Sequence, residues 1–174
     1  MNKELREFRR LERVCLEQAA LSTMDLARGG LLKVADDCRV AAEAIEAVGL
    51  LGEDRRDVGL LAITSADRLN AGWQAAERAR QRGNHRATSH VERLLGGLSR
   101  DCGIVSVLDG HPATLAWLGS VHGHKQKALG VEHFGQTGTV ADLYRHFGID
   151  ANAIVHAAQA AAPGRPVRYL KALP

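Results

Sequence analysis

Three short apolar runs in the later part of the chain limit the folds that are open to it. They read VGLLAITS, GIVSVLDG and, more weakly, KALGVEH, at residues 58–65, 103–110 and 127–133. Each has the length and composition of a strand, and continuous apolar strands are covered on both faces. This pattern predicts an α/β fold with a mostly parallel sheet between helices. The helix-compatible stretches around the runs are residues 71–82, 85–98, 114–121, 140–147 and 151–161.

The first 43 residues contain no strand signal and have a helical pattern instead. Apolar side chains recur there at helical spacing in two series. Between the series, Ser22 lies three residues before Asp25, which is close to a capping box. We therefore expect a helical hairpin at residues 1–43 and an α/β domain at residues 44–174. The two apolar stripes could face the rest of the chain or a partner, so internal packing and dimerisation both stay open.

Length and charge exclude several classes of protein. The 174 residues are enough for a domain with a real core. A net charge of +3 is too small to indicate nucleic-acid binding. The arginine-rich stretch at residues 77–93 also has no aromatic side chain on which bases could stack. No apolar run approaches the roughly 20 residues that a membrane helix needs. We expect neither nucleic acid nor a membrane among its partners.

The cysteines and the N-terminus indicate the compartment. Cys15, Cys38 and Cys102 are odd in number and far apart, which is typical of reduced thiols. The N-terminal segment is charged and lacks the apolar region of a secretory signal. Together these features predict a cytoplasmic protein.

Polar side chains follow each of the three expected strands. Parallel sheets bind ligands beyond the carboxyl ends of their strands, so these side chains are candidates for a site. Helix caps use the same residue types, and capping is the competing interpretation. Nucleotide-binding glycine motifs are absent, and Ser65 lies outside the Gly-x-Ser-x-Gly context of a nucleophile. The candidate ligand or interface residues are Ser65, Asp67, Arg68, Asp109, His111, His133, Gln136 and Thr137.

A compact histidine pair, His122 and His124, lies where an expected helix ends. Neither a cysteine nor a carboxylate is close to the pair in sequence, so we favour a solvated loop over a metal site. The residues alone therefore predict neither a metal ligand nor a catalytic side chain.

A longer stretch, HFGQTGTVADLYRHFGIDANAIVHAA at residues 133–158, has a more specific order. A Phe-Gly corner is followed by a polar step, a helix ending in FGI, a capping acid at Asp150 and an Ala-rich helix. This order resembles the end of the C-terminal domain of transketolase-like enzymes, in the branch that includes homodimeric pyruvate dehydrogenase. Two earlier stretches, DVGLLAITSADRLNAGW and IVSVLDGHPATLAWLGSV, are similar to strands and following segments of the same domain. The resemblance spans roughly residues 44–161 and implies a three-layer α/β/α domain.

The resemblance also implies which cofactors are involved and where they bind. Enzymes of this family use thiamine diphosphate and a divalent metal, usually magnesium, which the other two domains hold. The family's Gly-Asp-Gly motif with its later Asn is absent here, as is the region with the activating glutamate. We expect this chain to bind no cofactor and to catalyse no reaction alone. For Asp109, His111, His133 and Gln136 the resemblance implies at most a peripheral role.

Three functions follow from these patterns. The first is a non-catalytic assembly or interaction domain that forms a homo-oligomer or joins separate thiamine-binding domains. The second is a subunit of a split thiamine diphosphate enzyme. The third is an independent small-molecule binder at the strand ends.

The family domain begins with a strand, whereas this chain has the helical hairpin in that place. The missing strand leaves one edge of the sheet unpaired, and we expect the hairpin helices to cover that edge.

Overall fold

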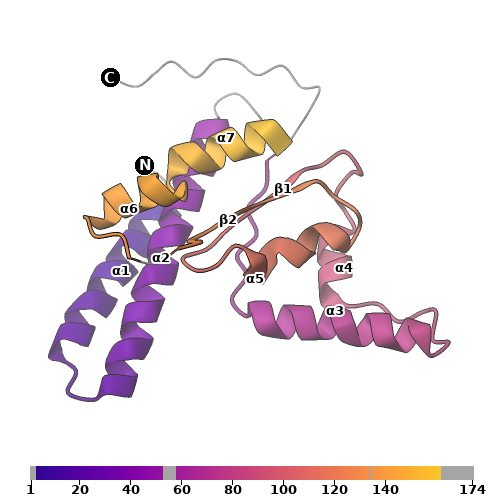
Figure 1. Ribbon diagram of the computed structural model, residues 1–174, viewed down its shortest axis with the longest axis horizontal. Helices are drawn as coiled ribbons and strands as arrows, with labels where there is room; N and C mark the ends of the chain where they lie inside the picture. Colours follow the sequence, from indigo (N-terminus) through magenta and orange to yellow (C-terminus); the bar gives the residue numbers. More distant parts are fainter. Residues whose placement is uncertain (1–2, 53–57, 134, 162–174) are drawn as a thin grey trace.

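The computed structural model describes residues 3–52, 58–133 and 135–161. Over these ranges the protein is mainly helical, with an N-terminal helical hairpin and a small parallel sheet. Figure 1 shows the hairpin on one side of the sheet and a group of shorter helices on the other. The α/β class and the hairpin are confirmed, whereas the described residues do not form the wider three-layer sandwich.

The hairpin consists of α1 (Lys3–Leu21) and α2 (Asp25–Gly52). Ala19 of α1 and Ala35, Cys38 and Ala42 of α2 are buried, so small side chains let the two helices pack closely. α2 is longer than expected and continues through the predicted boundary between residues 43 and 44. Its other face packs against the last described helix, at Ala151–Ala161. The helix α2 therefore belongs both to the hairpin and to the core beside the sheet.

The sheet has two parallel strands, β1 (Ile104–Val107) and β2 (Gln126–Leu129), as two of the three apolar runs predict. Ile104 is paired with Gln126, and Val107 with Leu129. The strands are joined by α5 (Ala113–Ala116) and a 3₁₀ turn, η1 (Trp117–Ser120). One cluster of apolar side chains lies beside α2, and a second lies beside α4. Alternate side chains of β1 pack into different clusters, because successive residues of a strand point to opposite faces. Val105 and Val107 pack with α2 and α7 (Ala151–Ala161), and Ile104 packs with α4 (His90–Leu95) and α5.

The strand expected at Val58–Ser65 is wrong, because residues 58–63 form an irregular segment. Val58 packs on the cluster beside α2, whereas Ile63 packs on the cluster beside α4. Leu60 and Leu61, between them, are about half exposed. The segment thus crosses from one cluster to the other without pairing to a strand. Apolar composition does not reveal this, since a strand also needs the backbone of a neighbour.

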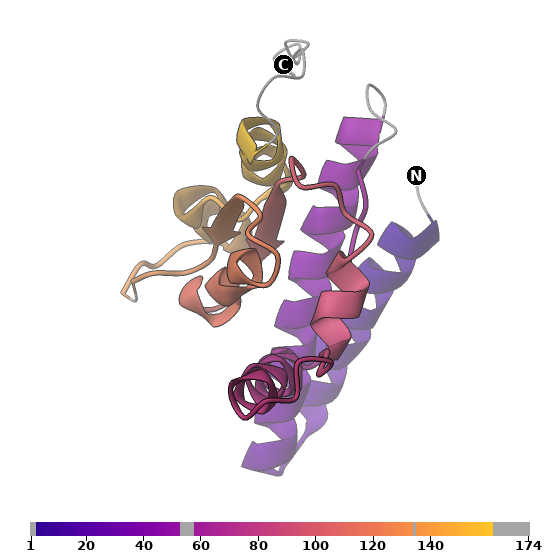
Figure 2. The ribbon, with the colours of Figure 1, turned by 90° about the vertical axis from the view of Figure 1, so that its right-hand side faces the viewer.

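The central helices begin and end where local capping dictates. α3 (Ala66–Gln81) starts earlier than expected, directly after Ser65. α4 is much shorter than the expected helix at residues 85–98, because Ser89 and Glu92 form a capping box that starts it at His90. Figure 2 views the molecule from the right-hand side of Figure 1, so that α4 and the end of α3 face the viewer.

The last two helices match the sequence prediction closely. α6 (Val140–Phe147) begins after Thr139, whose hydroxyl accepts a hydrogen bond from the Asp142 backbone N–H. It ends at Gly148, which has a φ of 64° and so occupies the left-handed region that favours glycine. Asp150 caps α7 as expected, since its Oδ1 accepts a hydrogen bond from the Ala153 N–H at 3.0 Å.

Candidate functional sites

A cleft of about 290 Å³ lies at the carboxyl ends of β1 and β2. The hairpin and α6 close it on two sides. One wall is apolar and includes Val140, Leu143 and Phe147 of α6. The polar side chains of the cleft come from four separate segments, and they are Asp36, Arg39, Asp109, His133, Gln136 and Tyr144.

Backbone contacts keep the two strand ends together at this cleft. Beyond the last paired residues, the Val131 N–H donates to the Gly110 carbonyl at 2.8 Å. A Cβ on Gly130 would collide with that same carbonyl and with Pro112, so the close approach needs a glycine. As a result, Asp109 after β1 and His133 after β2 lie on the same cleft.

Hydrogen bonds around the cleft join α6 to the end of β1 and hold Arg39 within the hairpin. The Tyr144 hydroxyl, in a buried side chain, donates to Asp109 Oδ2 at 2.9 Å. Arg39 is only 12% exposed and donates through Nε to Glu12 Oε1 at 2.7 Å. Its Nη1 donates to Asp36 Oδ1 at 3.0 Å. The guanidinium is therefore shared between two carboxylates of its own hairpin.

The same surroundings shift the pKa values of the groups in the cleft. Burial raises the pKa of Tyr144, and the neighbouring Asp109 carboxylate raises it further, so the phenol keeps its proton at neutral pH. Burial also raises the pKa of Asp36, followed by repulsion from Asp109, while Arg39 opposes both effects. Asp36 and Asp109 thus lie close enough to repel each other, and Arg39 and Lys33 offset part of this repulsion.

Of the eight predicted site residues, three line this cleft: Asp109, His133 and Gln136. Asp67 and Arg68 lie in the exposed first turn of α3, preceded by Ser65. None of these three lines the cleft, because the segment before them is not part of the sheet. The remaining two, His111 and Thr137, are exposed and also lie outside the cleft lining. His111 Nδ1 accepts a hydrogen bond from the Ala113 N–H at 3.2 Å, which is a capping contact.

Sequence reasoning missed Asp36, Arg39 and Tyr144. Asp36 and Arg39 fall within the predicted hairpin, and Tyr144 falls within the predicted helix at residues 140–147. One signal was available, because an Asp and an Arg three residues apart interrupt the apolar side of α2. Nothing in the sequence shows, however, that this side faces the strand ends.

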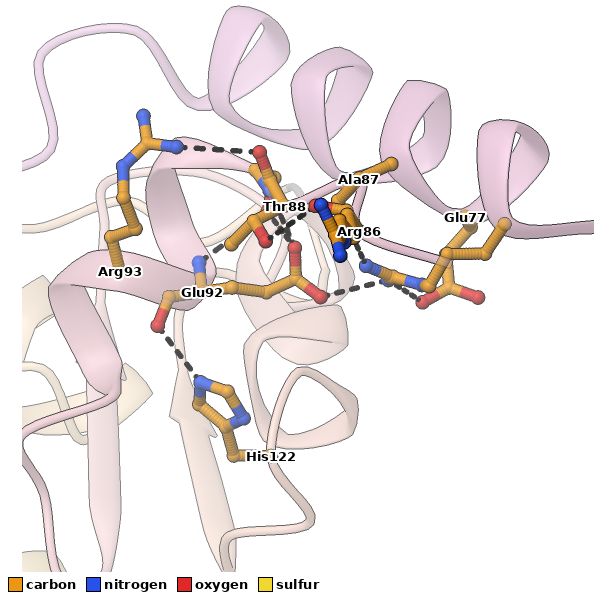
Figure 3. Close-up of polar contacts among 9 residues, drawn as sticks. Glu77, Arg86, Ala87, Thr88, Glu92, Arg93 and His122 are labelled. Carbon is orange, nitrogen blue, oxygen red and sulfur yellow. Dashed lines mark hydrogen bonds and ion pairs between the residues drawn. The ribbon is translucent and has the colours of Figure 1, made fainter. Parts of the chain in front are cut away.

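The histidine pair lies elsewhere and serves the packing of loops. His122 Nε2 is 2.9 Å from the Glu92 carbonyl oxygen, a contact drawn in Figure 3. His124 is buried, and its Nδ1 is 3.1 Å from the Cys102 carbonyl oxygen. Across residues 3–52, 58–133 and 135–161, no group of three or more His, Cys, Asp or Glu side chains could hold a metal ion.

Figure 3 also shows the network that joins α3 to α4. The Glu92 carboxylate accepts hydrogen bonds from the backbone and hydroxyl of Ser89, at 2.6 and 2.7 Å, and from Arg80 at 2.7 Å. Arg80 also contacts Glu77 and the Ala87 carbonyl. Because every acceptor is a carboxylate of α3 or α4 or a carbonyl of the segment between them, this network is structural.

A second surface of interest is the hairpin end, which we define as Leu21, Met24 and Leu26 at the turn between α1 and α2. These side chains are 77%, 67% and 88% exposed. In Figures 1 and 2 this turn projects beyond the other elements. Contiguous exposed apolar side chains are typical of interaction surfaces. Further exposed apolar side chains of the hairpin are Leu11, Val14, Leu16, Leu32 and Val34.

Comparisons with protein-family models, curated proteins and solved structures find no match for this chain. In the described part of the chain, no helix is both long and apolar enough to span a membrane. The expectations that depend on the resemblance to transketolase-like enzymes therefore stay predictions.

Proposed function

We propose that the chain is a non-catalytic assembly domain, which associates with a second copy of itself through the hairpin end. The observation that carries this proposal is the high exposure of Leu21, Met24 and Leu26. Covering such side chains removes apolar surface from water, at about 25 cal/mol per Å². In the described residues nothing from the same chain packs over them.

A second copy is the partner that best fits this surface. Two antiparallel hairpins complete a four-helix bundle when their exposed apolar edges meet. A two-fold axis brings each hairpin end to the same patch of its partner, so one apolar surface is enough. The flanking charges have both signs, and Lys33 is paired with Asp37 at 2.6 Å within the chain. Two copies therefore approach without a large repulsion.

The resemblance to transketolase-like enzymes supports the same class of function. Their C-terminal domain contributes to packing and dimer contacts, while other domains hold thiamine diphosphate and magnesium. On this basis the chain is an assembly piece rather than the catalytic part of such an enzyme. A second candidate, the subunit of a split thiamine enzyme, requires those domains on a separate polypeptide.

The test is the mass of the purified chain in solution, measured by light scattering or sedimentation. We expect a dimer, and we expect a Leu21→Gln, Leu26→Gln double variant to be a monomer with unchanged helix content. Leu60→Gln is the matched control, because Leu60 is also exposed but lies outside the hairpin. This control should remain a dimer.

A wild-type chain that is a monomer at every concentration would contradict self-association. A double variant that stays dimeric would place the interface elsewhere. Co-purification with a thiamine-binding polypeptide, together with a monomeric isolated chain, would favour the split enzyme instead.

A further inference from the structure

We propose that the cleft at the ends of β1 and β2 binds a small organic cation, with its ammonium or guanidinium group beside Asp109 and its apolar part against α6. This binding site is independent of the proposed self-association. It gives a specific ligand class to the third function expected from the sequence, small-molecule binding at the strand ends.

The first argument is the charge balance around the cleft. Two carboxylates, those of Asp36 and Asp109, and one guanidinium, that of Arg39, line the cleft. Arg39 already donates to Glu12 and Asp36, at 2.7 and 3.0 Å. Among the described residues, the only hydrogen bond to Asp109 comes from the neutral Tyr144 hydroxyl. Arg39 lies near Tyr144 and lowers its pKa, but Asp109 itself forms no ion pair among the described residues.

The second argument is the geometry of the Asp109 carboxylate. Tyr144 binds Oδ2 and so fixes the orientation of the group. Because the phenol keeps its proton, this hydrogen bond persists at neutral pH. The other oxygen, Oδ1, has no hydrogen bond in the described part of the chain, and its residue lines the cleft. A ligand N–H could donate to it, and hydrogen bonds between charged groups are roughly twice as strong as neutral ones.

The third argument is the shape and lining of the cleft. Its volume of about 290 Å³ is at the lower end for ligand pockets, which favours a small molecule over a peptide. Val140, Leu143 and Phe147 of α6 add an apolar part to the lining. A ligand with a cationic head and a short apolar body matches both parts of the lining. Phosphates and carboxylates fit poorly, because the excess charge of the cleft is negative.

The test uses three probes of nearly the same shape: benzylammonium, benzyl alcohol and benzoate. Each is titrated into the full chain at neutral pH and low salt, and binding is followed by backbone amide NMR shifts. We expect saturable shifts at Asp109, Gln136 and Tyr144 with benzylammonium only. Added sodium chloride should weaken this binding, because salt screens the attraction.

Asp109→Asn is the decisive variant, because it keeps an oxygen for Tyr144 but removes the charge. We expect it to weaken benzylammonium binding roughly tenfold or more, as for the loss of a charged hydrogen bond. Asp67→Asn is the matched control, since Asp67 is an exposed carboxylate outside the cleft. Should Asp109→Asn fail to fold, Asp36→Asn removes a charge from the same cleft and gives a second measurement.

Several outcomes would overturn the proposal. These are equal binding of benzyl alcohol or benzoate, an unchanged affinity in Asp109→Asn, equal weakening in Asp67→Asn, or no binding of any probe. Saturable shifts at the same residues with magnesium chloride alone would indicate an inorganic cation and would also overturn it. The mass of the chain in solution reports separately on self-association, so the two proposals fail independently.

Discussion

The capping box of α4 allows a quantitative prediction for Glu92→Gln. Burial alone would raise the pKa of Glu92, but hydrogen bonds from Ser89 and Arg80 outweigh it and lower the pKa from 4.5 to about 2. At 1.36 kcal/mol per pKa unit, this difference corresponds to about 3 kcal/mol of stability. The side chain is 12% exposed but lies near the molecular surface, so solvent screening reduces the expected value to about 1–3 kcal/mol.

The sign of the pH dependence follows from the lowered pKa. In acid the unfolded chain takes up this proton before the folded chain does, so protonation favours unfolding. The stabilisation is therefore complete above about pH 4.5 and is lost as the pH falls toward 2. At pH 3 it should be less than half of its value at pH 7. Glu92→Gln keeps an oxygen for the cap and removes only the charge.

Urea denaturation between pH 3 and 7 is the appropriate assay. Trp73 and Trp117 stack with ring centroids 5.3 Å apart, and their fluorescence reports on the cluster beside α4. At pH 7 we expect the variant to lose about 1–3 kcal/mol of unfolding free energy, and at pH 3 this difference should shrink to less than half. Glu77→Gln is the control, because Glu77 also contacts Arg80 but is 45% exposed, and its effect should be small. Equal stability at pH 7, or a difference that does not change with pH, would refute this reasoning.

Two further predictions concern the corner between α6 and α7, and the same denaturation assay checks both. Ile149 is completely buried, so Ile149→Ala should lower the unfolding free energy by about 2–5 kcal/mol and Ile149→Val by about 0.5–1.5 kcal/mol. Similar losses in the two variants would show that the side chain is not tightly packed. Gly148→Ala should cost about 1–2 kcal/mol because of its positive φ, whereas Gly49→Ala, in an open position within α2, should stabilise by about 0.5–1 kcal/mol. A stabilised Gly148→Ala would contradict the left-handed conformation.

The elements that the sequence predicts well are those with local signals. α6 and α7 match because Thr139 and Asp150 supply caps within one turn of the helix that each begins. β1 and β2 match because their apolar runs are short and flanked by polar residues. The run at Val58–Ser65 has the same composition, but it lacks a paired neighbour, and pairing is a long-range property.

The same distinction applies to the cleft. Asp109, His133 and Gln136 could be predicted, because the ends of adjacent parallel strands must lie side by side. Tyr144 and Arg39 could not, because their places depend on how α6 and the hairpin pack against the sheet. Tyr144 binds a carboxylate 35 positions earlier in the chain, and Arg39 reaches the cleft from a helix that the sequence assigns to another unit.

The length of α2 has one more consequence. The helix carries Leu26 near its start and Asp36 and Arg39 farther along, so about 15–20 Å of helix separates the two proposed binding surfaces. If pairing of two chains turns this helix even slightly, Asp36 and Arg39 turn with it at the edge of the cleft. Thermodynamic reciprocity then requires the amine to alter the dimer dissociation constant by the same factor by which dimerisation alters amine affinity.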